Sequence, residues 1–234
     1  MRHLPNVITL LNLFFGCLAV VSILNGNYQE GIIFTLAASV ADFADGAVAR
    51  VLKVSSPLGK ELDSLADMVS FGVTPGVIFY VLLKNAFPGG PEYGLHLAAA
   101  SGFLVSVFSG LRLAKFNLDT RQSENFIGLA TPACTIFTLG LLLIFEYDTS
   151  ALHDFVLQGW LLLLLVAVLC WLLISEIPMF SLKLKSFGWV GNEIKFIFAA
   201  FAVVELIFLK EAALAAIIFT YILLSLIGRS YFSK

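Results

Sequence analysis

Eight apolar segments, each about as long as a membrane is thick, fill most of this 234-residue sequence. A transmembrane helix needs about 20 consecutive, mostly apolar residues. The segments lie at about 6–25, 30–50, 60–84, 95–114, 127–145, 155–174, 193–209 and 212–228. Charged residues make up 13% of the chain, against roughly 25% in a soluble domain. The sequence therefore predicts an all-α, polytopic integral membrane protein without a soluble domain.

The distribution of lysine and arginine predicts how these segments are oriented. If the N-terminus is cytoplasmic, twelve of the 14 basic residues fall on the cytoplasmic side, and only Lys84 and Lys210 fall outside. Cytoplasmic loops of membrane proteins carry such an excess of basic residues. We expect both termini and any active site to face the cytoplasm, in a bacterial or archaeal cytoplasmic membrane. No basic tail or arm supports nucleic-acid binding.

Four aspartates, Asp42, Asp45, Asp63 and Asp67, interrupt the second and third apolar segments. A carboxylate in the membrane costs roughly 2.5–3.5 kcal/mol, so four would cost on the order of 10 kcal/mol unless something neutralises them. Their spacings of three and four residues put each pair on one face of a helix. A turn with a proline and a glycine, 55–59, lies between the pairs. The sequence predicts a helical hairpin with a four-carboxylate cluster near its cytoplasmic end.

The residue types in this cluster favour a hard divalent cation. Oxygen ligands suit Mg²⁺ or Mn²⁺, and two such ions could clamp a phosphate group between attacking and leaving oxygens. The three histidines fall at segment ends or in loops, which argues against zinc. Pairing with Arg50 and Lys53 alone is the simpler explanation, but four acids exceed two bases.

Small residues beside the aspartates predict a phosphate-bearing ligand. Gly46 and Gly59 lack side chains, so a bulky group could approach the helix backbone there. Ala49 continues the small surface next to Gly46, and Arg50 offers a charge suited to phosphate. Together these features predict a nucleotide diphosphate lying across two helices.

The same residues resemble the signature of the CDP-alcohol phosphotransferase family. The matching pattern is Asp42-x2-Asp45-Gly46-x2-Ala49-Arg50-x8-Gly59-x3-Asp63-x3-Asp67, with eight fixed residues over 26 positions. The resemblance implies a core of six transmembrane helices, usually dimeric, that binds two divalent metal ions and a CDP-linked donor. In this family the phosphoryl group of the CDP-linked donor passes to an alcohol, and CMP is released. We expect this core at 1–192 and an added transmembrane hairpin at 193–234.

The resemblance also implies roles for individual residues. Asp42, Asp45 and Asp63 match metal ligands, and Asp67 matches the base that deprotonates the acceptor hydroxyl and also contacts metal. The positions that match contacts to the CDP-lipid are Asn6, Thr9, Gly46, Ala49, Arg50, Ser56 and Gly59.

Four further stretches resemble the phosphatidylserine synthase branch of this family. They are PNVITLLNLFFG at 5–16, LDSLADMVSFG at 62–72, LRLAKFN at 111–117 and GLATPA at 128–133. The branch implies CDP-diacylglycerol and L-serine as substrates, in contact with membrane lipids. The serine carboxylate needs a nearby cation, so we expect Arg112 and Lys115 to contact serine. Asn117 is also expected at the serine site, although its amide could orient either substrate. Lys115 stands where the branch leads us to expect arginine, which keeps the charge but not the forked geometry.

Two alternatives remain at this point. Another acceptor, glycerol 3-phosphate or an inositol compound, would call for a denser basic pocket. A cation transporter could use the aspartates as an ion path, but its acids should spread across the membrane depth, whereas these gather near one side.

Overall fold

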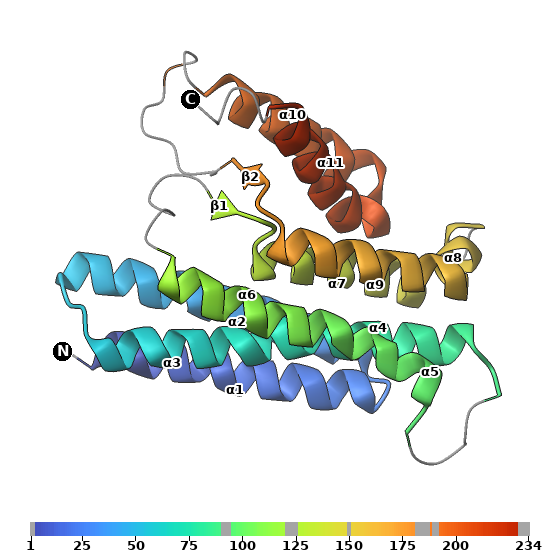
Figure 1. Ribbon diagram of the computed structural model, residues 1–234, viewed down its shortest axis with the longest axis horizontal. Coiled ribbons are helices and arrows are strands. Elements are labelled where there is room, and N and C mark those ends of the chain that lie inside the picture. Colours follow the sequence, from blue (N-terminus) through green and yellow to red (C-terminus); the bar gives the residue numbers. More distant parts are fainter. Residues whose placement is uncertain are drawn as a thin grey trace.

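The computed structural model describes residues 3–89, 95–119, 126–148, 151–180, 188 and 192–228. These residues form helices, apart from one pair of two-residue strands. Most helices run side by side in one bundle, and the hairpin of the last two long helices packs across it at an angle (Figure 1).

The first three apolar segments form long helices. α1 (Leu4–Leu24) packs along α2 (Tyr28–Leu52). The third segment combines α3 (Pro57–Asp67), the π-helical turn η1 (Met68–Val73) and α4 (Thr74–Ala86) in one continuous helix. A π-helical turn is rare, and such turns are frequent at functional sites; this one begins directly after Asp67.

The other five expected segments are also helical. They comprise α5 (Leu97–Ala100), η2 (Ser101–Phe103) and α6 (Leu104–Leu118), then α7 (Thr131–Tyr147), α8 (Ala151–Val156), α9 (Gly159–Ile174), α10 (Glu193–Phe208), η3 (Lys210–Ala212) and α11 (Ala213–Ile227). In the described part of the chain, five helical segments are long and apolar enough to cross a membrane, and α7 and α9 are shorter apolar helices. The prediction of a polytopic all-α membrane protein is confirmed.

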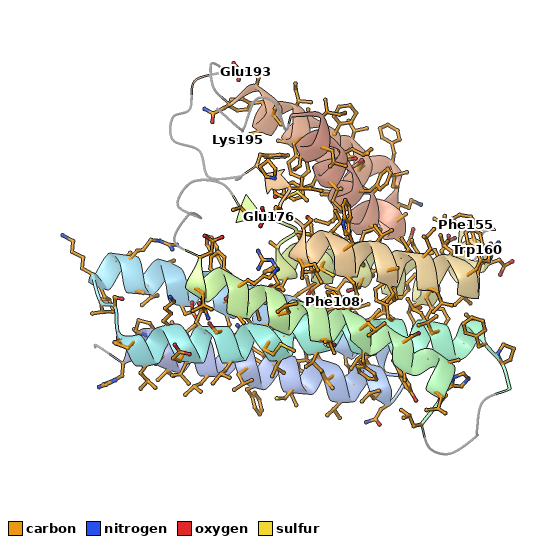
Figure 2. All side chains as sticks on the ribbon, in the orientation of Figure 1. Phe108, Phe155, Trp160, Glu176, Glu193 and Lys195 are labelled. Atoms are coloured by element: carbon orange, nitrogen blue, oxygen red, sulfur yellow. The ribbon has the colours of Figure 1, made fainter. Side chains whose placement is uncertain are left out.

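Large apolar side chains cover the outside of the bundle. Phe43 is 73% exposed and Phe208 is 75% exposed, which suits lipid rather than water. Phe155 and Trp160 project from the bundle at α8 and the start of α9 (Figure 2). Aromatic residues of this kind concentrate at the two membrane–water interfaces, so this end of the bundle fits one interface.

Small and hydroxylated residues hold the helices together inside the bundle. Ser70 donates a hydrogen bond to the carbonyl of Asn12, and Thr135 donates one to the carbonyl of Phe71. A Cβ at Gly76 would collide with the side chain of Ser106. Close helix packing through small and hydroxyl residues is typical of membrane proteins. Gly76 is therefore a packing residue, which lets its helix approach α6 closely.

A short antiparallel pairing connects the chain after α6 to the chain after α9. β1 (Phe126–Ile127) pairs with β2 (Pro178–Met179), and the N–H of Leu129 donates to the carbonyl of Leu172 at 2.9 Å. Gly128 lies between them with φ +73°, and carbonyl oxygens surround the space that its Cβ would need. The fifth segment therefore begins its helix at Thr131 and not at 127, because 126–129 are used in this pairing.

The last two helices attach to the bundle by close contacts. A Cβ at Gly140 of α7 would collide with the backbone of Ala215 in α11. The hydroxyl of Tyr221 in α11 donates to the carbonyl of Phe180 at 3.0 Å, beside a cluster that includes the ring of Phe198. The division at residue 192 stays a prediction, although these contacts join the hairpin firmly to the rest.

Candidate active site

Three of the four aspartates meet between α2 and α3. Carboxylate oxygens of Asp42, Asp63 and Asp67 lie within 4.8 Å of one another, and all three residues are partly buried. Asp42 and Asp67 approach to hydrogen-bonding distance. Two carboxylates this close repel each other unless a proton or a cation lies between them. One oxygen of Asp67, Oδ1, is buried without a hydrogen-bond partner among the described residues, so the group fits a metal ion with oxygen ligands.

The turn between the two helices brings these carboxylates together. Lys53 ends α2 in the left-handed conformation, with φ 51°. Ser56 then caps α3, because its hydroxyl accepts a hydrogen bond from the N–H of Gly59 at 3.0 Å, and Pro57 occupies the first turn. Serine at the cap and proline just inside the helix are both favoured at a helix start. The short turn returns the chain so that the aspartates of α3 face those of α2.

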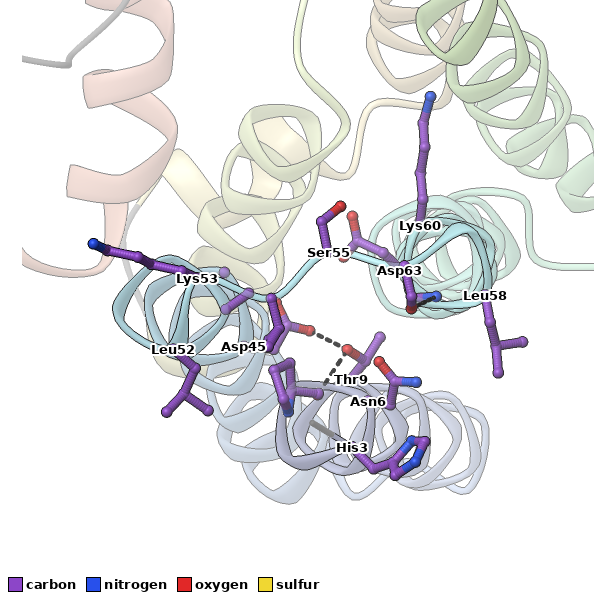
Figure 3. A pocket seen from close by; sticks show the side chains of 16 residues that line it. His3, Asn6, Thr9, Asp45, Leu52, Lys53, Ser55, Leu58, Lys60 and Asp63 are labelled. Atoms are coloured by element: carbon purple, nitrogen blue, oxygen red, sulfur yellow. Dashed lines mark hydrogen bonds between the residues drawn. The ribbon is translucent and has the colours of Figure 1, made fainter. Parts of the chain in front are cut away.

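Asp45 takes a different position from the other three. It lies outside the close group, is 7% exposed, and accepts a hydrogen bond of 2.5 Å from the hydroxyl of Thr9. Thr9 and Asn6 of α1 point between α2, which carries Asp45, and α3, which carries Asp63 (Figure 3). The predicted four-carboxylate cluster is therefore a group of three, with Asp45 beside it on the wall of an adjoining pocket.

That pocket has a volume of about 980 Å³ and opens among α1, α2, α3 and the turn between them. Ligand pockets usually measure roughly 300–1,000 Å³, so this one can hold a nucleotide diphosphate. Its lining includes six of the seven positions expected to contact the CDP-lipid: Asn6, Thr9, Gly46, Ala49, Ser56 and Gly59. The seventh, Arg50, lies next to it, since a Cβ on Gly46 would sit 3.3 Å from an Arg50 guanidinium nitrogen.

Three basic or titratable side chains in the pocket lining were not expected there. His3, Lys53 and Lys60 line it together with the predicted residues (Figure 3). The sequence placed Lys53 and Lys60 on the cytoplasmic side and offered Lys53 as a pairing partner of the aspartates, but it predicted no ligand contact for either residue. Their closeness to Arg50 in the turn was the available signal, because a cluster of cations suits a diphosphate.

The residues expected to contact serine fall into two places. Arg112 and Lys115 line a second, smaller pocket at the end of α6. Asn117 lies outside it, and its amide nitrogen donates to the hydroxyl of Ser64 at 2.8 Å, which joins α6 to α3 next to Asp63. Arg121, one of the twelve basic residues expected on the cytoplasmic side, lies outside the described residues.

Arg112 is a buried cation beside the aspartates. It is 6% exposed, its guanidinium carbon lies 5.7 Å from the ring centre of Phe116, and it interacts electrostatically with Asp67. Its Nε has no hydrogen-bond partner among the described residues. A buried donor without a partner costs about 1–3 kcal/mol, so this position is suited to an anionic ligand.

Comparison with known proteins places this arrangement in context. Residues 2–171 match the CDP-alcohol phosphatidyltransferase family. A CDP-diacylglycerol–serine O-phosphatidyltransferase of Bacillus subtilis is 34% identical over 132 residues, which cover 56% of this chain and 71% of that protein. The enzyme of the same name from Mycobacterium tuberculosis is 33% identical over 186 residues, 76% of this chain and 61% of its own length. That of Saccharomyces cerevisiae is 37% identical over 155 residues, covering 59% of this chain and 53% of the yeast protein.

Proposed function

The chain belongs to the CDP-alcohol phosphatidyltransferase family, and on that premise we propose that it is a phosphatidylserine synthase. It transfers the phosphatidyl group of CDP-diacylglycerol to the hydroxyl of L-serine and releases CMP. The names of the similar proteins support serine as acceptor. The observation that carries the proposal is the position of Arg112, a buried guanidinium without a partner for its Nε, beside Asp67.

In this proposal the larger pocket binds the donor. The CDP group lies over Gly46 and Gly59, where the absence of side chains leaves room. Lys53 and Lys60 in the pocket lining and Arg50 next to Gly46 add positive charge near the diphosphate. Leu58 is 62% exposed at the edge of this pocket, and the acyl chains leave past such apolar side chains into the membrane lipid.

The aspartates supply the sites for the divalent ions that the family requires. Asp42, Asp63 and Asp67 would hold a cation, and Asp45 would contribute from the wall of the donor pocket. We propose two ions, Mg²⁺ or Mn²⁺, since all the ligands are carboxylate oxygens. When bound, they neutralise the diphosphate and stabilise the charge that develops during transfer.

Asp67 acts as the general base on the acceptor. Its buried Oδ1 takes the proton of the serine hydroxyl. The serine oxygen then forms a bond to the phosphorus that carries diacylglycerol, the bond from that phosphorus to the CMP oxygen breaks, and CMP leaves. Arg112 binds the serine carboxylate and so orients the hydroxyl toward Asp67, which is the kind of positioning that accelerates a two-substrate reaction.

The cellular arrangement follows from the same proposal. The active site and both termini face the cytoplasm, where serine is available, and the protein works as a homodimer. The core at 1–192 carries the chemistry, and the hairpin at 193–234 is an addition to it.

The test measures CMP release by the purified protein in detergent. Every assay contains CDP-diacylglycerol and either Mn²⁺ or Mg²⁺. Serine, glycerol 3-phosphate and an inositol compound are tested as acceptors in separate assays, and the Asp67→Asn variant is measured in the same way. We expect release with serine alone, abolished by Asp67→Asn. Release with another acceptor would keep the family but refute serine. No release with any acceptor, by protein shown to bind metal, would refute the catalytic proposal.

A further inference from the structure

The smaller pocket at the end of α6 combines both signs of charge. Its volume is about 50 Å³, and Arg112 in its lining interacts electrostatically with Asp67 of the aspartate cluster. Its lining includes two basic residues, Arg112 and Lys115, and two acidic residues, Asp119 and Glu176. In the large pocket, by contrast, the charged residues in and beside the turn between α2 and α3 are the basic residues Lys53 and Lys60. A pocket with two bases and two acids suits a small ligand that itself carries both charges.

The position of Arg112 indicates that this pocket is built for a ligand. The side chain is more than nine-tenths buried, lines the pocket, and leaves Nε without a partner among the described residues. Because an unpaired buried donor is costly, a ligand carboxylate there recovers a hydrogen bond that the protein alone does not make.

Two chain segments far apart in sequence contribute the acidic residues that line the pocket. Asp119 directly follows α6, whereas Glu176 follows α9 and lies near β1 and β2 (Figure 2). The hydrogen bond from Leu129 to Leu172 and the β1–β2 pairing fix the chain around Glu176. Tyr221 of α11 extends this support, since its hydroxyl binds the carbonyl of Phe180 just beyond β2.

We propose that Asp119 and Glu176 bind the ammonium group of the acceptor, while Arg112 binds its carboxylate. This inference rests on the proposed function and adds the residues that select an α-amino acid. Glycerol 3-phosphate and inositol compounds have no ammonium group, and two carboxylates would repel a phosphate dianion. Residues 2–171 match the family as a whole, and Glu176 lies beyond them. A residue outside the shared part can serve one particular acceptor.

The experiment compares Glu176→Gln and Asp119→Asn with the unchanged protein in the CMP-release assay. Each substitution removes a negative charge and keeps the side-chain shape. Glu146→Gln is the matched control, because Glu146 is exposed near the end of α7, away from this pocket. The KM is measured for serine and, separately, for CDP-diacylglycerol. Inhibition by 3-hydroxypropanoate, which is serine without its amino group, reports binding that does not need the ammonium.

We expect at least one of the two variants to raise the KM for serine about tenfold, the effect of losing a hydrogen bond to a charged group. Its KM for CDP-diacylglycerol and its inhibition by 3-hydroxypropanoate should stay within about twofold, since neither depends on the ammonium site. Glu146→Gln should leave all three values unchanged.

Each contrary outcome has a separate meaning. If both variants bind serine as the unchanged protein does, the ammonium site is refuted and the proposed function stands. If the KM rises equally in Glu146→Gln, the effect is not specific and the inference is refuted. If the unchanged protein releases CMP only with another acceptor, the proposed function fails and this inference fails with it.

Discussion

Thr9→Val tests whether α1 positions Asp45 for the donor. Sequence resemblance assigns Thr9 to CDP contacts, but its hydroxyl lies 2.5 Å from an Asp45 carboxylate oxygen, and both residues are buried, with 4% and 7% exposed. Valine has nearly the same shape and removes the hydroxyl. A hydrogen bond to a charged group contributes about 1.5–3 kcal/mol, so its loss frees Asp45 to leave the orientation that the donor and metal require.

The expected result is a fall in kcat/KM for CDP-diacylglycerol of about 10- to 100-fold, because each 1.4 kcal/mol corresponds to a factor of ten. The Mn²⁺ concentration for half-maximal CMP release should rise as well, since Asp45 is proposed to contribute to metal binding. Thr9→Ser keeps the hydroxyl and should retain most of the activity. Thermal unfolding in detergent shows whether the variant is folded.

Thr35→Val is the matched control for this prediction. Thr35 lies on α2, is 1% exposed, and donates its hydroxyl to the carbonyl of Gly31 at 2.8 Å. Thr9 makes the same kind of contact with Pro5 at 3.0 Å, so the control removes an equivalent intrahelical bond and keeps the Thr9–Asp45 hydrogen bond. Wild-type kinetics and Mn²⁺ dependence in Thr9→Val would refute the role of Thr9, as would an equal loss in Thr35→Val.

Three further predictions concern the metal and the packing of the C-terminal helices. Chelation by EDTA should stop CMP release, and added Mn²⁺ should restore it; activity that persists in EDTA would contradict the role of the aspartates. Tyr221→Phe removes the hydrogen bond that the Tyr221 hydroxyl donates to the carbonyl of Phe180 and should lower stability by about 1–2 kcal/mol, measured as a lower unfolding temperature, and an unchanged temperature would argue against this contact. Gly140→Ala places a methyl group against the backbone of Ala215 and should destabilise by about 1–3 kcal/mol, whereas wild-type thermal stability would show that α7 and α11 separate easily.

The structure also indicates a structural role for the C-terminal hairpin that its sequence did not predict. α11 contacts α7 through Gly140 and holds the carbonyl of Phe180 through Tyr221. Phe180 follows β2, which pairs with β1 at the edge of the smaller pocket. The hairpin therefore supports a wall of the pocket proposed for the acceptor, through the side-chain hydrogen bond of Tyr221 to the chain that follows β2.

The sequence by itself determined the features that depend on neighbours along the chain. The length of each apolar segment predicted the helices, and spacings of three and four residues put Asp42 with Asp45, and Asp63 with Asp67, on shared helix faces. The helical period is a local property, so these predictions needed no knowledge of packing. The turn at 55–59 likewise predicted that the two pairs would meet.

The tertiary structure alone decided which side chains face each other across helices. Sequence spacing could not separate Asp45 from the other three aspartates, because its partner, Thr9, is 36 residues away on α1. Nor could it bring Glu176 into the same pocket as Arg112, since that depends on the pairing of β1 with β2 and on the packing of α6 against α9. Such contacts depend on how whole helices and loops pack, and no local period encodes them.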